Sequence, residues 1–293
     1  MRAFVSRVTL VLGVSALAAS ALGADIWATD NLGEVNGGSV GDRIIRFDSS
    51  APATPIVVGQ TGVAGTLMGG LDFDGSGNLW AWGQIGAPGL YSINQSTGAA
   101  TFVGNNVPNR LTLNDLAWDP AGNRMLAIGS STGRRAKTVL ASIDLTTGNA
   151  SLVSVLTGSF LPVGLGVSSN GTIYMHDIIS DQIFTISGST ATPLPSPIGY
   201  DSNFSQGMTI DWSHGDAGYH GAFNNLTFAT ELYSINLATG AETFGGNIGP
   251  FNSGTGLPEY ETGDVAIAPA GAVPEPTSLA LLTLAGLLGL RRR

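Results

Sequence analysis

The feature of this sequence that most constrains its fold is a pattern of four short apolar segments that recurs along the interior. One copy reads "GGLDFDGSGNLWAWG" and then "GLYSINQSTGAATFVG" (69–83 and 89–104), and the next copy begins "NDLAWDPAGNRMLAIG" (114–129). Gly, Ser, Thr and Asn fill the turns between the segments, which suits short strands joined by tight hairpins. No interior stretch keeps the 3.6-residue apolar period of a long helix. We therefore expect an all-β protein.

The spacing of the copies predicts the architecture. Five positions are equivalent, each just before the core of a first strand: Gly70, Asp115, Gly164, Gly207 and Asp264. They follow one another at intervals of 45, 49, 43 and 57 residues. A four-stranded unit of about 40–50 residues has the size of a β-propeller blade.

The fifth copy is divided between the two ends of the chain. Near the C-terminus, "GDVAIAP" (263–269) matches a first strand with nothing after it. Near the N-terminus, "ADIWATD", "DRIIRFD" and "TPIVVG" match the three strands that are missing. Joining them closes the ring without an open sheet edge. We predict a five-bladed β-propeller over residues 24–270, with one blade closed by both chain ends. A six-bladed ring with an extra blade in residues 213–264 is the main alternative, and an open β-sandwich would leave the repeat unexplained.

Residues 1–23 have the features of a secretory signal peptide. Arg2 and Arg7 flank the start of the chain, an apolar run follows, and "ALGA" (21–24) offers small residues for cleavage after Gly23 or Ala24. The apolar run is short for a transmembrane helix. We therefore expect the protein to be exported.

Charge and cysteine content narrow the function classes. The formal net charge is −9, and five of the 12 basic residues lie at the two ends of the chain. The interior is therefore more acidic than the whole, which disfavours binding to nucleic acid or to an anionic membrane. The chain has no cysteine, so its fold depends on no disulfide.

In propeller folds, ligand sites usually lie on the face formed by two sets of loops: those that join strand two to strand three and those that lead into strand one. We apply this fold-level analogy to the repeat. That face of the repeat collects acidic side chains: Asp30, Glu34, Asp115, Asp177, Asp181 and Asp264. His176 precedes Asp177 in "YMHD", although adjacent strand residues point to opposite faces. Carboxylates around a central opening can bind a ligand or act as an acid–base pair on a glycan. We treat five residues as candidate binding residues and assign no catalytic residue: Asp30, Asp115, His176, Asp177 and Asp264.

Two further motifs are incomplete as metal sites. Asp72, Asp74 and Ser76 alternate as at the start of a calcium-binding EF-hand loop and form a weak calcium candidate, but the twelfth position is Gly83 instead of a bidentate Glu. A hairpin turn is favoured there. His214 and His220 lie in "SHGDAGYH" without a third convergent ligand, so we expect solvated loop histidines. We predict no metal and no cofactor.

The C-terminal segment "VPEPTSLALLTLAGLLGLRRR" (273–293) joins two prolines, an apolar run and three arginines. The 13 residues Ser278 to Leu290 would form a helix about 20 Å long, short of the ~30 Å hydrocarbon core of a bilayer. The arginines have no place in a protein interior and favour the cytoplasmic side of a membrane. The segment therefore predicts a transient membrane contact through a short helix, with a permanent tail anchor as the alternative.

These residues resemble the PEP-CTERM sorting signal: the box Pro274, Glu275 and Pro276, the apolar run, and the terminal cluster Arg291, Arg292 and Arg293. The resemblance covers only residues 273–293 of the 293-residue chain. It implies a Gram-negative bacterium with an exosortase that recognises the box and processes residues 271–293. It also implies a location in the cell envelope, at the surface or in the extracellular matrix.

Taken together, these features predict an exported surface or matrix protein that binds polysaccharide or another protein through the loop face of a propeller and is not an enzyme. The export machinery and an exosortase are its expected processing partners. The alternative is an exported hydrolase or lyase that acts on glycans with the carboxylates named above. The sequence shows no nucleophile elbow, phosphate-binding loop or metal motif of recognised spacing.

Overall fold

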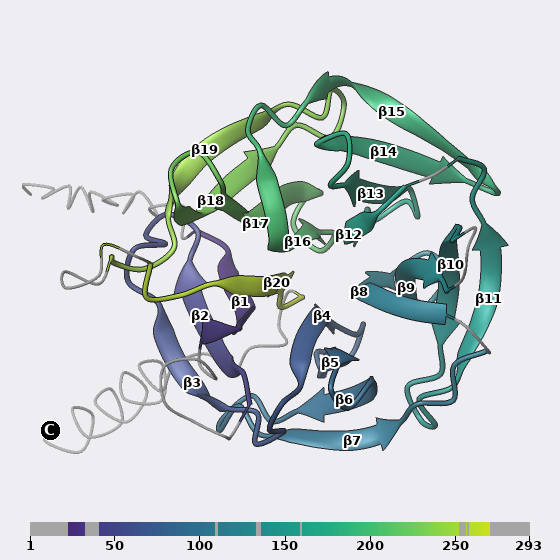
Figure 1. Cartoon of the computed structure of the whole chain (residues 1–293), viewed down its shortest axis with the longest axis horizontal. Helices are drawn as coiled ribbons and strands as arrows, with labels where there is room; N and C mark the ends of the chain where they lie inside the picture. Colours follow the sequence, from purple (N-terminus) through teal and green to yellow (C-terminus); the bar gives the residue numbers. More distant parts are fainter. Residues whose placement is uncertain are drawn as a thin grey trace, which may run out of the picture.

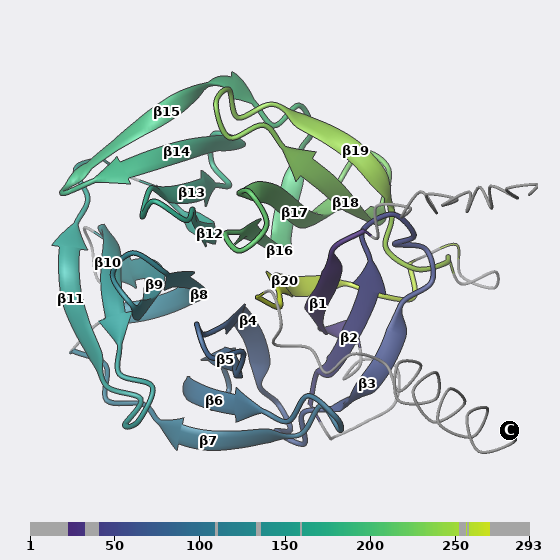
Figure 2. The same cartoon turned by 180° about the vertical axis from the view of Figure 1, so that it is seen from behind.

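Five antiparallel sheets of four strands each stand around a central axis, like the blades of a propeller (Figures 1 and 2). The computed structural model describes residues 23–32, 41–108, 111–132, 136–158, 160–251, 256 and 258–269. Within this part of the chain, the first strand of each blade lies nearest the axis and the fourth lies on the outside. The prediction of an all-β, five-bladed propeller is confirmed.

Each blade is a run of neighbouring strands. Blade 1 contains β4 (Leu67–Phe73), β5 (Leu79–Ile85), β6 (Gly89–Ile93) and β7 (Ala100–Gly104). Blade 2 contains β8 (Leu111–Asp119), β9 (Arg124–Ser131), β10 (Thr138–Ile143) and β11 (Ala150–Val155). Blade 3 contains β12 (Pro162–Val167), β13 (Ile173–Asp177), β14 (Gln182–Ser187) and β15 (Thr190–Pro197). Blade 4 contains β16 (Ser202–Asp211), β17 (Ala217–Asn224), β18 (Ala229–Ile235) and β19 (Glu242–Asn247).

Blade 5 joins the two ends of the described chain. Its innermost strand is β20 (Thr262–Ile267), and the other strands are β1 (Asp25–Asp30), β2 (Arg43–Asp48) and β3 (Ile56–Gln60). Residues of β20 pair antiparallel with β1, for example Val265 with Ala28. The split copy is therefore a single blade, as predicted. Residues 213–264 supply three strands of blade 4 and the start of β20, and among the described residues they form no sixth sheet.

The turns between third and fourth strands follow the repeated sequence. In three blades a glycine takes the left-handed conformation there, with φ of 72° at Gly98, 68° at Gly148 and 80° at Gly240. Such a φ strains any residue with a Cβ. An Asn or Asp opens each of these turns and accepts a backbone N–H with its side-chain oxygen.

The hydrophobic core lies between the blades. Trp27 of β1 meets Phe73 of β4 edge-on, with ring centroids 5.8 Å apart. Trp82 of β5 is 2% exposed and packs with Leu116 of β8. The aromatic residues thus fill the wedge between one sheet and the next. This packing holds the first strands around the axis, where the candidate site lies.

The predicted signal peptide and sorting signal fall almost entirely outside the described residues, on 1–22 and 270–293. The described part of the chain contains no helix long and apolar enough to span a membrane.

Candidate functional site

A repeated β-bulge shapes the end of the axis at which the first strands begin. In β4, β8 and β12 the pairing with the next strand shifts just before Gly70, Asp115 and Gly164. In β20 the shift falls just before Asp264. A bulge leaves one residue out of the ladder and re-aims it. The residues left out are Gly69, Asn114, Val163 and Gly263.

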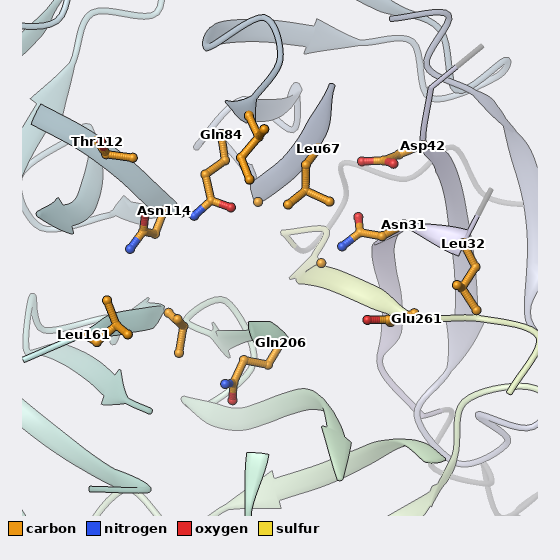
Figure 3. A pocket seen from close by; sticks show the side chains of 14 residues that line it. Asn31, Leu32, Asp42, Leu67, Gln84, Thr112, Asn114, Leu161, Gln206 and Glu261 are labelled. Carbon is orange, nitrogen blue, oxygen red and sulfur yellow. Dashed lines mark hydrogen bonds between the residues drawn. The ribbon is translucent and has the colours of Figure 1, made fainter. Parts of the chain in front are cut away.

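These four residues line one cavity, together with Gln206, which precedes Gly207 in β16. The cavity has a volume of about 540 Å³ and lies at the propeller axis, at the end where the first strands begin (Figure 3); we call it the channel-mouth cavity. Every blade contributes to it. It lies on the face predicted from the repeat, where first strands begin and second strands end. The remaining lining residues are Asn31, Leu32, Asp42, Leu67, Gln84, Ile85, Thr112, Leu161 and Glu261.

Carboxamides supply much of the polar lining. The Gln84 side chain donates to Asn114 Oδ1 at 2.8 Å, and Asn114 Nδ2 donates to the carbonyl oxygen of Pro162 at 2.7 Å. The amide of Gln206 contacts His220 Nε2 at 3.0 Å through its oxygen and donates to the carbonyl oxygen of Asn203. Asn31 Oδ1 is buried and has no hydrogen-bond partner among the described residues. These amides come from different blades and are held in place by their neighbours.

Aliphatic side chains and two acids complete the wall. Leu67 and Leu161 lie on opposite sides of the cavity (Figure 3), and Ile85 at the rim is 61% exposed. Asp42 accepts the backbone N–H of Met68 through Oδ2 at 2.7 Å. Glu261 enters from the start of blade 5. The 14 lining residues, all in the described part of the chain, include no Lys, Arg, His or aromatic residue.

Asp115 and Asp264 lie behind this wall and are fully buried. Asp115 accepts the backbone N–H groups of Leu116 and Leu165, one in its own blade and one in the next. Asp264 does the same with Val265 and Leu71. The two carboxyl groups also hydrogen-bond to each other, so they share a proton. Burial raises the pKa of Asp115 to about 8 and raises the pKa of Asp264 well above its ordinary value.

Asp72 joins β4 to β8 in the same way, because its two oxygens accept the N–H groups of Phe73 and Trp118. Burial raises the pKa of this carboxyl to about 7. Asp74 accepts the N–H groups of Ser76 and Asn78 and the indole N–H of Trp80. The segment proposed as a weak calcium candidate therefore has the bonding of a hairpin turn, with its carboxylate oxygens directed to protein donors.

The other candidate residues are dispersed. Asp30 is buried at the end of β1, forms an ion pair with Arg43 and accepts the N–H of Glu261. Burial raises the pKa of Asp30 against these hydrogen bonds. Asp177 accepts the N–H of Leu161 at 2.7 Å, so it supports a lining residue without lining the cavity itself. The structure thus brings Asp115 and Asp264 together and leaves the other candidates in separate contacts.

His176 is fully buried, and neither of its ring nitrogens has a hydrogen-bond partner among the described residues. Its ring meets the ring of His220 edge-on at 4.8 Å. Burial and the neighbouring His220 hold the pKa of His176 well below its ordinary value, although the Gln206 amide opposes this shift. His176 is therefore neutral and packs between blades 3 and 4.

Sequence reasoning missed a buried polar network in blade 4. His220 was expected in a solvated loop, but it lies in β17 and is fully buried. That expectation is wrong because the Gly- and Asp-rich segment before it is a short turn and not a long loop. His220 Nδ1 contacts Glu242 at 2.9 Å, and Tyr200 donates its hydroxyl to the same carboxylate at 2.9 Å. His214, in contrast, is 57% exposed at its side chain, as expected.

Known proteins resemble this chain in fold only. No family model matches the chain, and no curated protein matches it. A chain in a nidogen/laminin complex is 11% identical, with a TM-score of 0.48 over 84% of this chain and 98% of that one. A gluconolactonase from Xanthomonas campestris is 13% identical, with a TM-score of 0.46 over 78% and 77%. A putative gluconolactonase is 11% identical, with a TM-score of 0.49 over 83% and 81%. These likenesses concern the propeller and carry no statement about function.

Proposed function

We propose that this protein is an exported cell-surface or matrix protein of a Gram-negative bacterium that binds a polysaccharide or a surface protein at the mouth of its propeller channel. The observation that carries the proposal is the cavity of about 540 Å³ to which all five blades contribute. A concave site with a few convergent polar groups is the usual form of a ligand pocket. In this proposal residues 1–23 direct export, and an exosortase processes residues 271–293, which resemble the PEP-CTERM signal.

A binding role fits the carboxyl groups better than the alternative of glycan hydrolysis or elimination. A general acid or base must come within hydrogen-bond reach of the substrate. Asp115 and Asp264 are fully buried, and neither is among the residues that line the cavity. Each already accepts two backbone N–H groups. The oxygens of both carboxyl groups therefore join neighbouring blades.

The proposal is tested with protein purified after expression of the full chain. We expect it to bind extracellular polysaccharides or surface proteins on an array and to leave the same glycans uncleaved in a turnover assay. Fractionation of producing cells with and without the exosortase checks the location. Glycan turnover that disappears in Asp115→Asn protein would instead identify an enzyme.

A further inference from the structure

Most polar groups that line the channel-mouth cavity are uncharged amides, which can donate and accept hydrogen bonds. A carboxamide offers two N–H donors and a carbonyl acceptor without a net charge. The described contacts of Gln84 use one N–H, to Asn114, which leaves its carbonyl oxygen and a second N–H for a ligand. Asn31 Oδ1 is a buried acceptor with no hydrogen-bond partner in the part of the chain that the structure describes. Buried polar atoms are nearly always hydrogen-bonded, so an unpartnered one beside a cavity indicates a missing donor.

Apolar surface alternates with these amides around the opening. Leu161 and Val163 lie at the entry to blade 3. Leu67 of blade 1 lies across the cavity from Leu161 (Figure 3). Thr112 adds a hydroxyl on the side of blade 2. A ligand with polar edges and C–H surfaces matches such a wall, since each polar edge finds an amide or hydroxyl and each C–H surface finds a leucine or valine.

The charge of the site restricts the ligand further. Among the 14 described lining residues, Asp42 and Glu261 are acidic and none is basic. An anion entering here would lose its water and would meet no cationic side chain among the described lining residues in exchange, which costs free energy. The described lining therefore favours an uncharged ligand over a carboxylated, sulfated or phosphorylated one.

We propose that this cavity binds the end of a neutral glycan and discriminates against anionic glycans. The inference rests on the proposed binding function and names its ligand class. The hydroxyl groups of an uncharged sugar satisfy Asn31, Gln84 and Thr112, and its C–H face packs against Leu161 and Val163. Two bulged glycines make room for these amides, because a Cβ at Gly69 would lie 2.9 Å from Gln84 Oε1 and a Cβ at Gly263 would lie 2.7 Å from the Asn31 amide.

The test measures affinity by calorimetry for two sets of oligosaccharides of equal length. One set is neutral (gluco-, manno- and galacto-oligosaccharides), and the other is anionic (oligogalacturonate and oligoalginate). We expect binding to at least one neutral member and none to the anionic set. Gln84→Ala should weaken neutral binding by about three- to tenfold through the lost hydrogen bond. Leu161→Arg should abolish it by filling the apolar wall with a cation.

Gln60→Ala is the matched control, because Gln60 is an exposed amide on the outer strand β3 and should leave affinity unchanged. Thermal unfolding of each variant checks that the fold is intact, and Gln84→Ala keeps the test decisive if Leu161→Arg fails to fold. Preferential binding of the anionic set, or neutral binding unaffected by Gln84→Ala, would overturn the inference and leave the proposed function standing. A protein ligand without glycan binding would do the same. Absence of every glycan and protein ligand would overturn both.

Discussion

At the scale of single residues, the Asp115–Asp264 pair combines a structural contact with an unusual protonation state. Both carboxyl groups are withdrawn from solvent, and each bridges its own blade to the next through backbone N–H groups. Two carboxylates this close cannot both be ionised without a large cost, so one proton stays between them. The nearby carboxyl of Asp72 adds to the same effect on Asp115.

The pair makes folding stability depend on pH. The folded-state pKa values of Asp115 and Asp264 are raised above those of the unfolded chain, so the folded protein holds protons that the unfolded chain releases. The stabilisation is complete below pH of about 4 and is lost as the pH rises through about 8. One such group contributes a slope of at most about 1.4 kcal/mol per pH unit. Asp115→Asn removes one titrating group and keeps the shape of the pair.

We therefore expect the unfolding free energy of Asp115→Asn to fall less steeply than that of the original protein between pH 5 and pH 8, as measured by urea denaturation. Asp144→Asn serves as the control, because Asp144 is an exposed turn residue. Equal slopes for the original protein and Asp115→Asn would show that the dyad holds no proton in this range.

Single residues also show how much of the candidate site can be predicted from the sequence. The repeat identifies Asp115 and Asp264 as equivalent positions and predicts the face on which the cavity lies. It does not reveal the bulges, which depend on pairing between strands. In each of these two bulges, the residue directly before the aspartate is turned toward the axis. Asn114 and Gly263 therefore line the cavity, and Asp115 and Asp264 lie behind them.

At the scale of elements, the strands of blade 4 are joined by a buried network of polar side chains as well as by apolar contacts. Glu242 reaches from β19 to His220 on β17 and to Tyr200 in the preceding loop. Tyr200 stacks on Tyr233 of β18 at 4.2 Å between ring centroids. Burial and the Glu242 carboxylate raise the pKa of Tyr200 well above its ordinary value, so the phenol stays a donor. No motif spacing predicts this network, since its members meet only after three strands have paired in register.

Loss of the Glu242 carboxylate should destabilise this network within blade 4. Glu242→Ala removes the carboxylate that contacts both the buried His220 ring and the Tyr200 hydroxyl, and each buried polar group left unsatisfied costs about 1–3 kcal/mol. Glu242→Gln keeps the size and one acceptor oxygen, so it should cost clearly less. Urea denaturation of the two variants measures the difference. Similar losses in both variants would contradict this expectation, because they would mean that neither the size of the side chain nor one acceptor oxygen can replace the carboxylate.

At the scale of the whole molecule, the closing blade makes the two ends of the described chain interdependent. β20, near the C-terminal end of the described chain, pairs with β1, near its N-terminal end. The β20 side chains Val265, Ala266 and Ile267 are buried between blades. This feature was predictable, because a first strand without partners and three strands without a first can be recognised from the repeat alone. The packing angle between blades was not, since it depends on side-chain contacts such as that of Trp27 with Phe73.

Removal of residues 262–293 tests the ring directly. The truncated chain would lose β20, leave the inner side of β1 unpaired and remove the Asp264 carboxylate that accepts the Leu71 N–H. Because the first strands of blades 1 and 4 both pack against β20, the damage would reach two interfaces as well as the closing blade. We expect calorimetry to show no cooperative unfolding transition for this chain. A chain ending at residue 269 keeps every described strand and should unfold cooperatively. If the shorter chain unfolded with the same sharp transition, the other four blades would be stable without closure, and the shared blade would serve some purpose other than holding the ring together.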